Sequence, residues 1–184
     1  MSRFLLGVTG ASGAVYAART LFHLKRLGHT VALVKTSAGK SVAEFEGISD
    51  ALLRADTVLE NDDFFSEAAS GSSLLSGMAI VPCSMGTLGK VAGGIADNLL
   101  TRAADVCLKE RRPLVVVPRE MPYSLIHLEN MERLILAGAT VISASPHFYT
   151  NPQTVENLVD TVVAKILTHL GVPNEIVPKW GISR

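Results

Sequence analysis

Short apolar runs of strand length alternate along the chain with stretches in which apolar residues recur at helical spacing. The apolar runs, which predict buried strands, are residues 4–9, 30–34, 79–81, 114–117 and 140–142. The stretches of helical spacing, which predict helices, are residues 16–27, 37–45, 125–137 and 155–170. Between residues 48 and 76 the pattern weakens, and clusters of small polar residues predict loop. Apolar strands that alternate with helices are typical of a parallel sheet covered by helices on both faces.

The length and composition predict one domain. A chain of 184 residues falls within the usual size of a single domain, and a 48% apolar content supplies a core and excludes a disordered chain. We therefore predict a single domain over residues 1–184, with residues 172–184 as a C-terminal tail that packs at a subunit interface.

The charge balance bears on the partners of the chain. Lys and Arg together number 17, as do Asp and Glu, so the basic excess typical of nucleic-acid-binding proteins is missing. We therefore expect no nucleic acid partner. A neutral, apolar surface also offers little repulsion between copies, which favours a homo-oligomer.

The cysteines and histidines are not arranged for metal binding or disulfides. Cys83 and Cys107 lie in apolar contexts without a CxxC spacing, which fits a reduced, cytoplasmic protein. The five histidines include no HxxxH pair, so no metal is predicted. No apolar stretch reaches the length of a membrane span, and we expect no membrane insertion.

The loop after the first predicted strand, residues 10–13, favours a single phosphate over a dinucleotide. The dinucleotide fingerprint requires glycine where this chain has Val8, and no acidic residue follows the second strand. A small-residue turn at a helix start still offers backbone N–H groups to one phosphate, with the Ser12 hydroxyl beside them. A tight turn of purely structural significance is the alternative.

Charged residues in apolar surroundings point to a phosphorylated substrate. The cations are Arg102, Lys109, Arg119 and Lys165. Arg119 and Glu120 directly follow a buried strand, where a cation would neutralise a phosphate and a carboxyl group would transfer a proton. Solvated helix faces or structural ion pairs are the alternatives. Tyr149 and Trp180 are either core aromatics or π-faces for a cationic intermediate.

Eight motifs, spread nearly from end to end, resemble those of the UbiX-type flavin prenyltransferase family. They are residues 9–13, 69–72, 82–88, 102–106, 108–112, 118–120, 127–131 and 148–149. The resemblance implies a three-layer α/β/α, Rossmann-like (flavodoxin-like) subunit with a parallel sheet, assembled as a homododecamer that binds FMN where subunits meet. It also implies a metal-independent enzyme that joins the dimethylallyl group of dimethylallyl phosphate to reduced FMN. The product, prenylated FMN, would serve a UbiD-type decarboxylase in ubiquinone biosynthesis or aromatic acid decarboxylation.

The resemblance also implies roles for individual residues. Residues expected to bind FMN are Gly10, Ala11, Ser12, Thr36, Ser84, Met85, Gly86, Thr87 and Arg119. Those expected to bind the prenyl phosphate are Arg102, Lys109, Glu120, Tyr149, Lys165 and Trp180. Those expected to act in catalysis are Ser12 and Glu46 as a proton relay, Glu120 as the acid for the departing phosphate, and Lys109 as a phosphate ligand.

This chain departs from the family pattern at three places. Thr36 stands for a serine, Lys165 for a residue that is usually arginine, and either Phe64 or Phe65 for an aromatic residue near the prenyl group.

Two other functions are compatible with such a fold. An FMN-dependent cysteine decarboxylase requires an early catalytic histidine and an Asn-rich loop, whereas His23 and His29 come late and residues 82–87 contain no asparagine. A non-catalytic flavin carrier would have no second phosphate for its cations to bind.

Overall fold

The computed structural model describes residues 1–178 as alternating strands and helices. The strands are β1 (Arg3–Val8), β2 (Thr30–Lys35), β3 (Thr57–Leu59), β4 (Gly77–Cys83), β5 (Leu114–Pro118) and β6 (Thr140–Val141). The helices are α1 (Ala14–Arg26), α2 (Ser37–Phe45), α3 (Ser49–Leu52), the 3₁₀ turn η1 (Glu67–Ala69), α4 (Met85–Ala92), α5 (Leu99–Lys109), α6 (Leu125–Leu136) and α7 (Val155–His169). In this part of the chain all strand pairs are parallel, in the order β3-β2-β1-β4-β5-β6. This is the Rossmann order, and it confirms the predicted α/β class.

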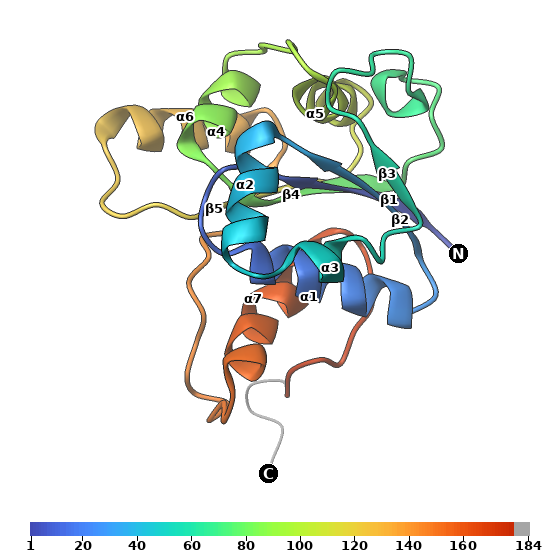
Figure 1. Ribbon diagram of the computed structural model, residues 1–184. Coiled ribbons are helices and arrows are strands. Elements are labelled where there is room, and N and C mark those ends of the chain that lie inside the picture. The colour runs from blue at the N-terminus through green and yellow to red at the C-terminus, as the bar shows by residue number, and fades with distance from the viewer. Residues whose placement is uncertain (179–184) are drawn as a thin grey trace.

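Alternation along the strands produces two apolar layers. Phe4, Leu6 and Val8 of β1 face the layer that contains α1 and α7, whereas Leu5 faces the layer that contains α4 and α5. Figure 1 shows α4, α5 and α6 on one side of the sheet and α1 and α7 on the other. The strands β4 and β5 are buried on both sides, which explains why they are apolar throughout rather than alternating.

The segment predicted as loop, residues 48–76, contains three short elements instead. They are α3, β3 and η1, none longer than 4 residues. The pattern also gave no sign of α5, which begins after the turn at Gly93 and Gly94 and is capped by Asn98. By contrast, the predicted helices 37–45 and 155–170 agree with α2 and α7 to within one residue.

The C-terminal tail begins against its own subunit. Val172 is buried in the α1/α7 layer and Ile176 packs against it. Trp180, a predicted prenyl-binding residue, lies outside the described residues. The proposal that residues 172–184 pack at a subunit interface stays a prediction.

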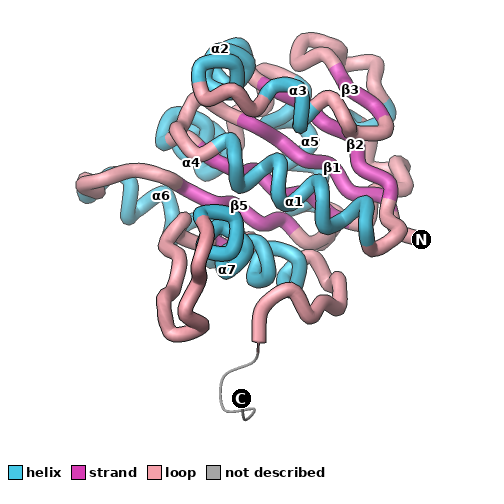
Figure 2. The backbone as a smooth tube through the Cα atoms, turned by 60° about the horizontal axis from the view of Figure 1, so that its bottom comes forward, coloured by secondary structure: helices cyan, strands magenta, loops and turns pink. Residues whose placement is uncertain are grey.

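A buried charge cluster fastens α1 to α7, which run side by side across the sheet in Figure 2. The Asp160 carboxylate accepts hydrogen bonds from Arg19 Nε at 2.9 Å and Arg19 Nη2 at 2.5 Å, and lies 3.1 Å from His23 Nε2. Burial raises the pKa of Asp160, but the hydrogen bonds and charges of His23 and Arg19 outweigh it and lower that pKa from its ordinary value. Asp160 is therefore ionised and paired at neutral pH.

Replacing Asp160 by Asn should destabilise the fold by about 2–3 kcal/mol, since it leaves Arg19 without its partner in a largely buried position. Urea unfolding at fixed protein concentration measures the loss. The stabilisation by ionised Asp160 is fully present above its ordinary pKa of 3.8, and it is lost as the pH falls through the lowered pKa of the folded protein. The unfolding free energies of the variant and the native protein should therefore converge in acid.

The matched control is Glu60→Gln, which removes an exposed ion pair with Lys40 and should leave the unfolding curve unchanged. Equal urea-unfolding curves for the Asp160 variant and the native protein at neutral pH would contradict a stabilising role for the Asp160–Arg19 ion pair.

Candidate functional site

The strand order reverses between β1 and β4, and ligands of open α/β sheets bind at such a switch point. Thr9, directly after β1, joins the two diverging loops here. Its hydroxyl donates to the Pro82 carbonyl at 2.9 Å and accepts from the Ser84 N–H at 2.7 Å. Thr9 is only 1% exposed, so these bonds are shielded from water. The β1 and β4 loops are thereby held at a fixed separation.

Close packing brings the start of α2 to the same place. A Cβ on Gly10 would lie 2.6 Å from the Ala38 Cβ, and one on Gly39 would lie 2.4 Å from the Val8 carbonyl oxygen. Both positions therefore require glycine. Thr36, the N-cap of α2, accepts a hydrogen bond from the Gly39 N–H at 3.0 Å. Three helix starts, those of α1, α2 and α4, thus surround the switch point.

The first turn of α4 fits an anionic group such as the phosphate of FMN. The Ser84 hydroxyl caps the helix by accepting from the Thr87 N–H, and it donates to the Thr87 hydroxyl at 3.2 Å. Within residues 1–178 the N–H groups of Met85 and Gly86 make no hydrogen bond, and a Cβ on Gly86 would meet open space. Free N–H groups at a helix start, with room in front of them, are the donor set that phosphate prefers.

The start of α1 is different, because it already holds an anion. The Glu46 carboxylate accepts from the Gly13 N–H at 2.8 Å and from the Ala14 N–H at 2.7 Å. Gly13 has a φ of 108°, a conformation that favours glycine and turns its N–H towards Glu46. The Gly13 and Ala14 N–H groups are therefore already paired with a carboxylate of the chain itself. Glu46 fixes the loop that carries Ser12.

Arg119 and Glu120 line a hollow at the carboxyl ends of β5 and β6. The Arg119 Nε donates to the Ser12 carbonyl at 3.1 Å, which joins the β5 loop to the β1 loop. The Glu120 carboxylate accepts from the Met121 N–H at 3.0 Å. The hollow has a volume of about 400 Å³, and its polar lining also includes Tyr123, Ser143 and Ser145.

The sequence interpretation missed four polar residues here: Thr9, Tyr123, Ser143 and Ser145. Ser143 lies 2.6 Å from Ser145 and 3.4 Å from the Tyr123 hydroxyl, oxygen to oxygen. The sequence did contain a signal for Ser143 and Ser145. Both come just after the predicted strand 140–142, as Ser84 comes just after the predicted strand 79–81, and ligands bind beyond the carboxyl ends of such strands. Nothing in the local sequence marks Tyr123.

Arg102 and Lys109 form a second group, away from the first. Arg102 donates to the Ala69 carbonyl at 3.1 Å and pairs with Asp105 at 2.7 Å, while Lys109 pairs with Glu110. Lys109 ends α5 just before β5, whereas Arg119 follows β5, a strand of 5 residues. Lys109 is therefore separated from Arg119 by about one strand length, roughly 15 Å. One subunit does not bring Lys109 to Arg119.

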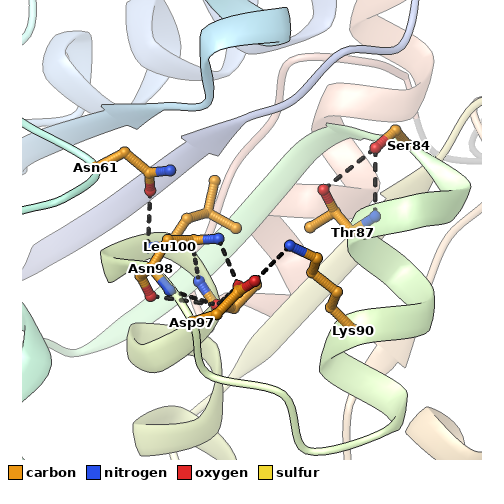
Figure 3. A network of polar contacts seen from close by, with 8 residues as sticks. Asn61, Ser84, Thr87, Lys90, Asp97, Asn98 and Leu100 are labelled. Atoms are coloured by element: carbon orange, nitrogen blue, oxygen red, sulfur yellow. Dashed lines mark hydrogen bonds and ion pairs between the residues drawn. The ribbon is translucent and has the colours of Figure 1, made fainter.

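The corner between α4 and α5 is fixed by the polar network in Figure 3. Lys90 of α4 pairs with Asp97 at 2.6 Å, and Asn98 caps α5 through the Thr101 N–H. The Asn61 side-chain oxygen accepts from the Leu100 N–H at 3.0 Å. This network sets the direction of the helix that carries Arg102.

Tyr149 and Lys165 belong to a third group, where residues 143–154 lie against α7. The Tyr149 ring stacks on His147, with ring centroids 3.8 Å apart and planes within 8°. Lys165 is exposed on α7, and its charge acts on His147. Of the two candidate aromatics near the prenyl group, Phe65 is fully exposed and Phe64 about half exposed.

The residues that the structure describes hold no metal-ligand group, membrane-spanning helix or reactive thiol. Within residues 1–178, no group of three or more His, Cys, Asp or Glu is placed to hold a metal ion. No helix among these residues is both long and apolar enough to cross a bilayer. Burial raises the pKa of the Cys107 thiol to about 11 and that of Cys83 further, so both thiols are protonated at neutral pH.

The fold and the donor set at its switch point define a flavoprotein, and the Flavoprotein family model matches residues 1–167. A curated relative, the flavin prenyltransferase UbiX of Thermoplasma acidophilum, is 47% identical over 181 residues, which cover 97% of this chain and 99% of the relative. The chain belongs to the UbiX family of flavin prenyltransferases.

Solved structures agree with this family. A crystal structure of AnUbiX (PadA1) in complex with FMN and dimethylallyl pyrophosphate matches with a TM-score of 0.93 and 36% identity, over 100% of this chain and 99% of that one. A dodecameric FMN-dependent Ubix-like decarboxylase from Escherichia coli O157:H7 matches with a TM-score of 0.92 and 39% identity, over 97% and 98%. The peptidyl-cysteine decarboxylase EpiD, at 20% identity and a TM-score of 0.64, shares the fold alone.

Replacing Glu46 by Gln should lower stability by about 1–2 kcal/mol and weaken FMN binding. An amide has only one acceptor oxygen, so either the Gly13 or the Ala14 N–H loses its partner. Urea unfolding and a flavin fluorescence titration measure the two effects. Glu44→Gln, an exposed carboxylate on the same helix, is the control. A variant that binds FMN normally and loses only turnover would instead support Glu46 as a proton relay.

Proposed function

We propose that the protein transfers the dimethylallyl group of dimethylallyl phosphate to reduced FMN, forming prenylated FMN. The observation that carries this proposal is the open first turn of α4 at the switch point, beside the Arg119 and Glu120 hollow. Support comes from the family and from AnUbiX, whose subunit is closely similar and whose crystal structure contains FMN and dimethylallyl pyrophosphate.

FMN would be held at the switch point by backbone and hydroxyl groups. The residues are those expected from the sequence: Gly10, Ala11, Ser12, Thr36, Ser84, Met85, Gly86, Thr87 and Arg119. The α4 N–H groups and the Arg119 guanidinium suit its phosphate, and the Ser12 loop is fixed by Glu46. Bound reduced FMN supplies the nucleophilic nitrogen and carbon of its ring system.

The cations act on the prenyl phosphate. Breaking the allylic carbon–oxygen bond develops negative charge on phosphate, which Arg102, Lys109 and Lys165 would stabilise by donating hydrogen bonds. Glu120, in the hollow, would protonate the departing phosphate. Tyr149 would donate its phenol to the same phosphate, and Trp180 would offer a π-face to the cationic allyl group.

The separation of Lys109 from Arg119 supports a site shared between subunits. α6 leaves Leu125, Ile126, Leu128, Ile135 and Leu136 half exposed or more, and Leu134 is its one buried residue. An apolar helix face of this kind is suited to cover by another copy. We propose a homododecamer, as described for the Escherichia coli relative, in which a neighbour supplies Arg102 and Lys109.

We further propose that the reaction takes place in the cytoplasm and that a UbiD-type decarboxylase uses the product. The reduced, buried cysteines are compatible with that compartment. The decarboxylase partner rests on the family resemblance.

The cysteine decarboxylase alternative has less support. Its early histidine would have to be His23 or His29, but His23 lies in the Asp160 cluster between α1 and α7 and is 3% exposed. The His29 ring meets the Phe4 ring edge to face near the amino end of β1. Neither lies at the switch point.

Anaerobic incubation with reduced FMN and dimethylallyl phosphate should yield a flavin heavier by one five-carbon prenyl unit. Mass spectrometry of the released flavin measures the product. Lys165→Gln should raise KM for the prenyl phosphate while FMN affinity stays unchanged, because the lysine is assigned to the other substrate. FMN of unchanged mass from folded, saturated protein would contradict the transferase and support the carrier.

Mixing two inactive variants should restore activity if the site is shared. Oligomers assembled from equal amounts of Lys109→Ala and Arg119→Ala subunits should recover about a quarter of native activity, because a quarter of the sites combine the two intact side chains. The activity of the reassembled mixture measures the recovery.

The matched control combines Lys109→Ala with Arg102→Ala subunits. Both residues come from the same helix, so no mixed site has both intact, and activity should stay absent. Recovery in the control, or none in the first mixture, would contradict a shared site.

A further inference from the structure

His147 was not among the residues predicted for the site, yet it lies between two that were. Its imidazole ring is parallel to the Tyr149 ring, with centroids 3.8 Å apart and an angle of 8° between the planes. One face of the phenol is therefore covered by a flat ring, and Tyr149 still keeps about half of its surface exposed.

The backbone of His147 is fastened to α7. Its N–H donates to the Thr161 hydroxyl at 3.3 Å, and that hydroxyl donates to the Leu158 carbonyl at 2.7 Å. Thr161 is 2% exposed, so this anchor belongs to the core rather than to the loop surface. Thr161 and Lys165 are four residues apart on α7, which makes them neighbours along the helix.

The His147 imidazole contacts Tyr149 as a neutral, flat ring rather than as a cation. Its Nδ1 is buried and has no hydrogen-bond partner within residues 1–178. Burial lowers the pKa of His147 from its ordinary 6.5, and the charge of Lys165 lowers it further. The ring is therefore neutral at pH 7, and its contact with Tyr149 is one of ring faces.

We propose that His147 is a positioning residue for the prenyl phosphate: anchored to α7 through Thr161, its ring holds Tyr149 on the side of the helix that carries Lys165. The inference rests on the proposed function, which assigns Tyr149 and Lys165 to that phosphate. Without the stack, the Tyr149 ring loses the flat surface that fixes its plane, and donor binding must order it at a greater entropic cost. His147 thus acts on donor binding and not on the flavin.

The test compares three variants by steady-state kinetics with reduced FMN and dimethylallyl phosphate. His147→Ala removes the ring and should raise KM for the donor about three- to tenfold, the range expected from losing one aromatic pair. The kcat and the FMN dissociation constant should change less than about twofold. His147→Phe keeps a flat ring without the unpaired nitrogen and should restore KM, whereas His147→Leu fills similar space without a flat face and should not.

Gln153→Ala is the matched control, because the exposed Gln153 side chain donates a hydrogen bond within the same loop, to the Asn151 carbonyl at 2.9 Å. An unchanged donor KM in His147→Ala, or equal KM values in the Phe and Leu variants, would overturn the inference. If His147→Ala does not fold, the donor KM values of His147→Phe and His147→Leu test the positioning role instead.

A parallel Lys165→Gln measurement separates this inference from the proposed function. If Lys165→Gln raises the donor KM and His147→Ala does not, the positioning role alone fails. If Lys165→Gln also leaves KM unchanged, or the native protein makes no prenylated flavin, the assignment of the donor site fails and the positioning role falls with it.

Discussion

The buried hydroxyl of Thr9 is the interaction on which the site depends. In a doubly wound sheet the chain leaves β1 and β4 in opposite directions, so the two loops diverge beyond the last paired residues of the strands. Thr9 donates to one residue of the β4 loop, Pro82, and accepts from another, Ser84. Because Ser84 also caps α4, a single side chain after β1 sets the position of the helix start that faces the ligand.

Helix starts at the switch point divide into two kinds. At the start of α1, the Glu46 carboxylate accepts the hydrogen bonds of the Gly13 and Ala14 N–H groups and neutralises the partial positive charge of the helix end. These bonds fix the loop that carries Ser12. The α4 start keeps the N–H groups of Met85 and Gly86 open to an anion. A carboxylate at one start and free donors at the other would direct a phosphate to α4.

The sequence predicted every described strand except β3, because the others are local apolar runs, whereas β3 is short and largely exposed. Residues that follow a strand, such as Ser84 and Arg119, became candidates for the site for the same reason. The sequence did not predict that Glu46 accepts a hydrogen bond from the Gly13 N–H, 33 positions away along the chain. Nor did it predict α5, whose beginning depends on the glycine turn, the Asn98 cap and a contact from Asn61. Local patterns show where strands end, whereas pairing between distant loops depends on the folded topology.

The position of Lys109 follows from the same topology. A helix that returns from the carboxyl edge must end near the amino edge before the next strand, so a cation at the end of α5 is held roughly one strand length from a residue that follows β5. No side-chain movement closes a gap of that size, since a lysine extends only about 6 Å from its Cα. Lys109 would therefore serve the carboxyl edge of the sheet only if another copy of the chain brings it there. The exposed apolar face of α6 is a surface on which such a copy would bury apolar side chains. Association would thus complete the site and cover this helix in a single step.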